Sequence, residues 1–139
     1  MIGTISAETG TQRTLGYLIE IGHADGGARC ILDVTEAHTN RHDVLHGGIA
    51  ATLLDNAMGA TSSLTVDATG RTPFLTVSMT TQFVAAARAG QRLTATGRVT
   101  GGGRSLLFLA AELLDEDRRL IASATGVFKR AKLDRGGDA

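Results

Sequence analysis

A run of small and apolar residues from 46 to 64 dominates the hydrophobic pattern of the chain. Its apolar positions fall on every side of a helix, which we predict over about 48–64. A helix that is apolar all round is buried, and at 1.5 Å per residue this one is about 24 Å long. Asp55 is the one carboxylate in the run and has no basic neighbour there, so its burial is costly unless it is hydrogen-bonded or takes part in chemistry.

Before the helix, two apolar segments predict a β-hairpin. The segments at 15–21 and 28–35 flank the sequence Asp-Gly-Gly at 25–27, which is a strong turn signal. The polar stretch 36–45 then leads directly into the helix. Polar loops beside the start of a buried helix often carry binding groups, so we expect part of the functional site there.

After Pro73, period-two alternation predicts four strands, at 74–87, 91–100, 105–114 and 120–129. The separators between them are short and turn-like, so we expect successive strands to pair antiparallel. In the first of these strands, Thr76 and Ser78 are predicted on one polar face. The opposite, apolar face is predicted to carry Leu75, Val77, Met79 and Phe83.

Two strands, one long helix and four strands predict an α+β fold. We expect a curved antiparallel sheet of five to six strands to wrap the central helix. The length suits a single domain over 1–139, with loose ends at 1–14 and 131–139.

Composition narrows the class of protein. The 14 basic and 14 acidic residues give zero net charge, so nothing favours a nucleic-acid partner. No uncharged apolar run reaches the roughly 18 residues of a membrane span, and the N-terminus has no signal-peptide pattern. Cys30 is the one cysteine, which excludes a disulfide framework and the usual spacing of metal ligands. We therefore expect a cytoplasmic protein without a metal site or a membrane partner.

One constellation carries a family resemblance: Asn40, then His46-Gly47-Gly48 six positions later, then Asp55 in the helix. With the segments 75–83 and 120–128, it resembles hotdog-fold thioesterases of the phenylacetate-degradation (PaaI-like) type, over about residues 15–130. Members of that family often have glycine three positions before the histidine, where this chain has Asp43. Aspartate tolerates left-handed backbone better than most residues, so the loop can keep its course.

The resemblance implies an acyl-CoA thioesterase in which coenzyme A is part of the substrate and no cofactor is needed. Asp55 would activate water or attack the thioester itself. The Gly47 N–H, unpaired at a positive helix end, would hold the thioester carbonyl together with the Asn40 amide. Thr76 would orient Asp55 or its water, with Ser78 as the rival hydroxyl. His46 is expected to be a structural donor that fixes the loop, and the alternative is a general base.

Spacing along the helix adds a constraint. Gly47 and Asp55 are eight residues apart, which is about 12 Å along one helix. A carbonyl clamp and a base must both lie about 3 Å from one reacting centre. We therefore expect a homodimer with shared active sites, in which each site takes Gly47 and Asp55 from different chains. The family resemblance implies further pairing of dimers, giving a homotetramer.

The remaining site residues are expected around the acyl group and coenzyme A. We expect the acyl pocket beside Gly48, Leu54, Met58 and Phe83. Candidate partners for the phosphates of coenzyme A are the basic side chains of Arg104, Lys129 and Arg130. Two alternative functions stay open: a hotdog acyl-CoA hydratase or dehydratase, and a non-catalytic acyl-CoA binding protein. The natural acyl group is not specified by the sequence.

Overall fold

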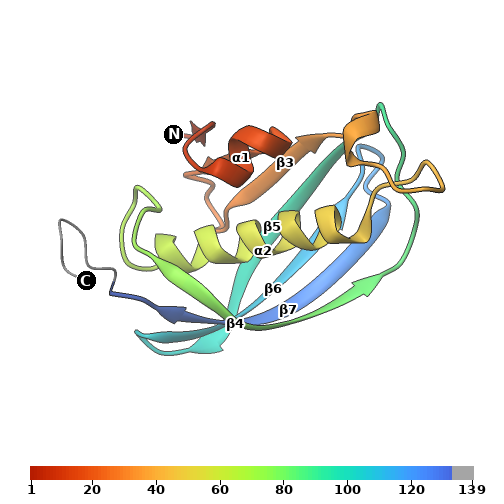
Figure 1. Cartoon of the computed structure of the whole chain (residues 1–139). Helices are drawn as coiled ribbons and strands as arrows, with labels where there is room; N and C mark the ends of the chain where they lie inside the picture. The colour runs from red at the N-terminus through yellow and green to blue at the C-terminus, as the bar shows by residue number, and fades with distance from the viewer. Residues whose placement is uncertain (133–139) are drawn as a thin grey trace.

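A curved antiparallel sheet wraps around one long helix (Figure 1). The computed structural model describes residues 1–132, and seven strands of that part form one sheet in the order β1-β2-β3-β5-β6-β7-β4. In chain order the elements are β1 (Gly3–Ile5), α1 (Gly10–Leu15), β2 (Leu18–Ile21), β3 (Arg29–Asp33), the 3-10 turn η1 (Glu36–His38), α2 (Gly47–Leu64), β4 (Phe74–Phe83), β5 (Arg92–Gly102), β6 (Leu106–Leu114) and β7 (Leu120–Arg130). The α+β class, the central helix and the first hairpin are confirmed.

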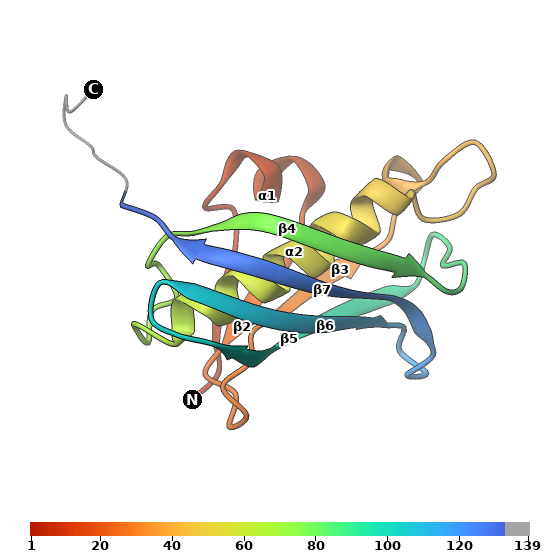
Figure 2. The ribbon, with the colours of Figure 1, turned by 90° about the horizontal axis from the view of Figure 1, so that it is seen from below.

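The pairing of β4 differs from the prediction. Successive strands were expected to pair, but β4 pairs with β7 and β5 pairs with β3. The connection 84–91 is the reason, because it does not form a tight turn. The Val84 N–H donates to Ile121 O, while Gly90 N–H donates to Val34 O on the other side of the molecule. The chain thus crosses the end of the sheet, and β4 is left at the edge with β7 on one side (Figure 2).

The expectation of a loose end at 1–14 was wrong, and the sheet has seven strands because of this segment. β1 pairs with β2, and α1 follows it. Thr9 accepts a hydrogen bond from Gln12 N–H at the start of α1, and Gly16, at φ 85°, ends it. The Gln12 side chain is buried and donates to Ile5 O at 2.8 Å, which ties α1 to β1. We call residues 3–15 the N-terminal arm.

At the other end of the chain, β7 continues to Arg130, and the Ala131 N–H donates to Pro73 O. The rest of the end predicted to be loose, 133–139, lies outside the described residues. Neither α1 nor α2, the α-helices of residues 1–132, is long and apolar enough to cross a bilayer.

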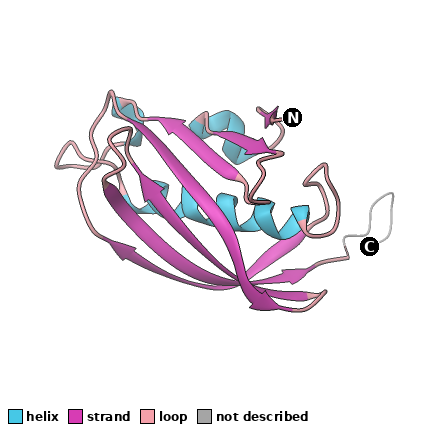
Figure 3. Ribbon diagram, turned by 180° about the vertical axis from the view of Figure 1, so that it is seen from behind, coloured by secondary structure: helices cyan, strands magenta, loops and turns pink. Residues whose placement is uncertain are grey.

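The helix α2 packs closely against the concave side of the sheet. Leu53, Leu54, Ala57 and Met58 are fully buried against the strands. At Gly97 of β5 the helix backbone comes so close that a Cβ atom would collide with Ala57 O. Figure 3 shows the sheet curving around α2 from behind, and Figure 1 shows that the opposite side of α2, between α1 and β4, has no strand over it. The helix therefore has one partly open side.

Gly97→Ala is expected to lower the free energy of unfolding by about 1–3 kcal/mol, because the added methyl group forces α2 away from β5. Urea unfolding of the variant checks this. Gly103→Ala is the matched control, since a Cβ there meets nothing within 4 Å. Equal stability of the two variants would contradict the close contact.

Candidate active site

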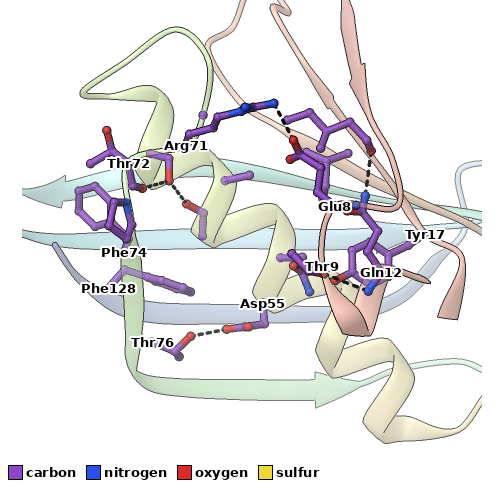
Figure 4. A pocket seen from close by; sticks show the side chains of 18 residues that line it. Glu8, Thr9, Gln12, Tyr17, Asp55, Arg71, Thr72, Phe74, Thr76 and Phe128 are labelled. Carbon is purple, nitrogen blue, oxygen red and sulfur yellow. Dashed lines mark hydrogen bonds and ion pairs between the residues drawn. The ribbon is translucent and has the colours of Figure 1, made fainter. Parts of the chain in front are cut away.

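Asp55 and Thr76 meet on the open side of α2. The Thr76 hydroxyl donates to Asp55 Oδ1 at 2.6 Å, which links the middle of the helix to the start of β4 (Figure 4). Asp55 is partly exposed rather than buried, contrary to the expectation from the apolar helix. The second carboxylate oxygen accepts no hydrogen bond from residues 1–132, so it is available to a ligand or a water.

A β-bulge decides between Thr76 and Ser78. Thr76 lies opposite Phe128 and Ser78 lies opposite Val127, so Val77 is an extra residue in β4. Because Phe128 and Val127 are adjacent in β7, their partners point to opposite faces of the sheet. The prediction that Thr76 and Ser78 share a face was therefore wrong. The bulge turns Thr76 toward α2, as bulges beside functional sites commonly do.

The Asp55–Thr76 pair lines a cavity of about 320 Å³, which we call the Asp55 cavity. This volume is at the low end of the range for small-molecule sites, about 300–1,000 Å³. Its walls come from α2, the start of β4, the loop before β4 and the N-terminal arm (Figure 4). The arm contributes Ile5, Glu8, Thr9 and Gln12. On its other side Asp55 lines an open groove of about 490 Å³.

Tyr17 forms the wall between the cavity and the groove, and it lines both. Its hydroxyl donates to Asn56 Oδ1 at 3.2 Å, and the Asn56 amide donates to Thr52 O at 2.8 Å. Burial raises the pKa of Tyr17, so the hydroxyl stays protonated as a donor. Sequence reasoning placed Tyr17 in a strand segment, 15–21, without a role at the site, and it missed the arm because residues 3–15 carry no motif or periodic pattern.

The start of α2 presents an unused backbone donor. His46 Nδ1 accepts from Gly48 N–H at 2.8 Å and caps the helix, so in this contact the imidazole is an acceptor rather than a donor. Among residues 1–132 the Gly47 N–H has no acceptor. The Phe83 ring lies against Gly47, where a Cβ atom would be 3.3 Å from a ring carbon. Gly47 thus has a free donor beside an aromatic wall.

The loop before α2 fixes the Asn40 side chain. Its carbonyl oxygen accepts from His42 N–H at 2.9 Å and more weakly from Val44 N–H at 3.4 Å. Asn40 Oδ1 therefore accepts hydrogen bonds within the loop, and the Nδ2 group of Asn40 can donate to a ligand. Asp43 has φ 59°, so the chain does adopt the left-handed conformation for which family members use glycine.

Several predicted site residues lie elsewhere. Leu54 and Met58, expected in the acyl pocket, are fully buried against the sheet and line neither hollow beside Asp55. Arg104 lies in the turn between β5 and β6. Gly47 and Phe83 line a separate cavity of about 200 Å³ that shares no residue with the hollows of Asp55. Within one chain, the clamp and the carboxylate therefore face different spaces.

The loop before β4 is ordered by Asp67. Its carboxylate accepts hydrogen bonds from the hydroxyls and the N–H groups of Thr69 and Thr72. These bonds, those from the hydroxyls above all, hold the pKa of Asp67 well below its usual range. The loop then presents Arg71 and Thr72 to the Asp55 cavity. Across the described residues, no cluster of His, Cys, Asp and Glu has the makings of a metal site.

Comparison with known proteins identifies the family of this chain. The family model of the thioesterase superfamily matches residues 42–122. Acyl-coenzyme A thioesterase 13 of Homo sapiens is 32% identical over 105 residues, which are 76% of this chain and 73% of the relative. Among solved structures, zebrafish thioesterase superfamily member 2 is 29% identical with a TM-score of 0.75, covering 89% of this chain and 88% of that one.

The PaaI protein of the phenylacetic acid degradation operon of E. coli has the same fold, with a TM-score of 0.79 and 24% identity over 90% of this chain and 86% of that one. The chain belongs to the thioesterase superfamily and has its hotdog fold. It is an enzyme of the thioester hydrolase class, as the resemblance in the sequence implied.

Thr76→Val is expected to lower kcat for thioester hydrolysis roughly 10- to 100-fold, because it removes a hydrogen bond to a charged group at nearly constant volume. Steady-state kinetics checks this. Ser78→Ala, on the opposite face of β4, is the matched control and is expected to keep the wild-type kcat. A larger loss in Ser78→Ala than in Thr76→Val would reverse the assignment.

Proposed function

We propose that this enzyme hydrolyses acyl-CoA thioesters to a free acid and coenzyme A, at sites shared between two subunits. The observation that carries this proposal is the Asp55–Thr76 pair, which opens on a ligand-sized cavity while its second carboxylate oxygen is unoccupied. The names of the curated relatives support acyl-CoA as the substrate class. Neither a metal nor a cofactor is needed for this chemistry.

In the proposed mechanism the thioester carbonyl accepts hydrogen bonds from the Gly47 N–H and the Asn40 amide. Both donors gain strength as negative charge develops on that oxygen. Asp55 takes a proton from a water that adds to the carbonyl carbon, or adds to that carbon itself. The carbon–sulfur bond then breaks, and the coenzyme A sulfur leaves as a thiolate that is protonated afterwards. Where Asp55 itself adds to the carbon, the product is a mixed anhydride, and a water then hydrolyses it to release the acid and restore the Asp55 carboxylate. Thr76 holds the carboxylate in one orientation throughout.

The free edge of β4 supports a shared site. Its outer edge pairs with no strand of residues 1–132, and its sequence carries no charge that would block pairing. Leu75, Val77, Phe83 and Val84 are 54–62% exposed there. A second copy pairing antiparallel along this edge brings the end of its β4, with its Gly47 and Phe83, beside the start of this β4 with Thr76 and Asp55.

We place the acyl group in the Asp55 cavity and coenzyme A on the neighbouring surface. Arg104, Lys129 and Arg130 are the proposed partners of its phosphates. Arg130 lines a hollow of about 510 Å³ with Lys132 and Ser105, next to Pro73 at the start of β4. The proposed acyl group is aryl or aliphatic.

A dimer of dimers is the proposed assembly. On the convex face, Leu106 and Leu75 flank Lys129 in one row across three strands, and exposed Phe108 lies next to them. Patches of this kind mark protein contacts more often than chance.

We also propose a cytoplasmic location, which the single cysteine supports. Burial raises the pKa of the Cys30 thiol and keeps it unreactive.

Asp55→Asn is expected to lower kcat for acyl-CoA hydrolysis by at least 100-fold, because the amide neither accepts a proton nor attacks a carbonyl. A panel of aryl, short and medium aliphatic acyl-CoA substrates checks this with both proteins. Hydration of enoyl-CoA by the wild type would favour the hydratase alternative, although no histidine among the described residues lines the hollows of Asp55. Tight binding without turnover would favour the binding protein.

Mixing two inactive variants tests the shared site directly. Asp55→Asn removes the carboxylate, and Gly47→Val blocks the carbonyl clamp with a side chain. After unfolding and refolding together in equal amounts, half of the dimers contain one chain of each kind, with one intact site of two. We expect about a quarter of the wild-type activity to return. No recovery, with both variants folded and dimeric, would place each site within one chain.

A further inference from the structure

Two segments far apart in the sequence close the Asp55 cavity opposite the reactive carboxylate. The N-terminal arm contributes Glu8, and the loop before β4 contributes Arg71. Glu8 Oε1 and an Arg71 guanidinium nitrogen lie 2.6 Å apart, and within residues 1–132 this is the ion pair that joins the arm to the rest of the fold. Figure 4 shows the pair on the side of the cavity away from Asp55 and Thr76.

Hydrogen bonds order the two segments that carry Glu8 and Arg71. The Glu8 N–H donates to the Gln12 side chain at 3.1 Å, and Gln12 is itself buried. Arg71 follows the turn that the Asp67 carboxylate orders. The Glu8 and Arg71 side chains are 40% and 67% exposed, so the pair lies where the cavity meets solvent. A ligand that starts at Asp55 and fills the cavity therefore reaches the pair last.

The wall between these two ends is made of small side chains. Gly59 and Ala60 line the cavity from one turn of α2, and Ser63 lines it from the next. Phe74 and Phe128 also line the cavity, and the Phe128 ring lies beside Gly59, where a Cβ atom would be 3.5 Å from a ring carbon. The space thus runs along α2 past two aromatic rings, and the charged pair lies at its outer end.

We propose that the Glu8–Arg71 ion pair is a gate that limits the length of the acyl group, an inference that rests on the proposed acyl-CoA hydrolysis in the Asp55 cavity. A short acyl group ends below the pair and leaves it intact. A longer one has to part the two charges and lay hydrocarbon against them, which costs free energy because neither charge keeps its partner. The arm then selects substrates by length, although it contributes nothing to the reacting atoms.

Glu8→Gln and Arg71→Met test the gate, because each removes one charge of the pair. Glu8→Gln also keeps the length of the side chain. The measurement is kcat/KM over straight-chain acyl-CoA substrates from acetyl to tetradecanoyl, expressed as the ratio of long to short substrates. We expect this ratio to rise about fivefold in each variant, since an exposed ion pair is worth up to about that factor.

Asp33→Ala is the matched control. It breaks the Asp33–Arg92 pair, which is similarly exposed and lies outside the Asp55 cavity, and the ratio should stay at the wild-type value. Ratios within twofold of wild type in both gate variants would overturn the gate while leaving the proposed hydrolysis intact. If wild type hydrolyses no acyl-CoA at all, the proposed function fails and the gate falls with it. Thermal unfolding confirms that each variant is folded.

Discussion

The contact between α2 and β5 at Gly97 fixes the depth and the rotation of the central helix. The Thr61 hydroxyl donates to Ala57 O at 2.6 Å and accepts from Ala28 N–H at 2.9 Å, at the same place where Gly97 leaves no room for a side chain. Since residues three and four apart share a helix face, burying Ala57 and Thr61 turns Asp55 the other way. A helix that looks apolar all round therefore keeps its carboxylate partly exposed, and the cost of a buried charge does not arise.

The extra residue in β4 places Thr76 beside the carboxylate that α2 leaves partly exposed. Without the bulge at Val77, strict alternation would put Thr76 and Ser78 on one face, and Asp55 would face a different set of β4 side chains. With the bulge, Thr76 faces Asp55. The residues after the bulge still alternate between the helix side and the convex side of the sheet, but the alternation is shifted by one residue. The same strand has an unpaired outer edge. One edge strand thus carries both the partner of the carboxylate and the surface proposed for the second subunit.

The sequence predicted the elements that rest on strong periodicity. The helix boundary was right to within one residue, and the strands after Pro73 begin within a residue or two of their predicted starts. Their order in the sheet was not predictable from separators alone, because the separator 88–90 has turn composition yet belongs to a connection, 84–91, that crosses the end of the sheet. The bulge gave no signal, since Val77 fits the alternating pattern as well as any neighbour. Leu54 and Met58 were misplaced for a related reason: when every face of a helix is apolar, composition does not tell which face meets the sheet.

The N-terminal arm escaped prediction because polar contacts hold it in place rather than an apolar stripe. His38 Nδ1 accepts from Thr35 N–H at 2.9 Å, so its Nε2 carries the proton and donates to Leu15 O at 2.8 Å at the end of α1. The start of the arm is held by the pairing of β1 with β2, and Tyr17 bonds to Asn56 just beyond the end of the arm. Hydrogen bonds to the backbone at both ends thus hold the arm beside the cavity that it lines.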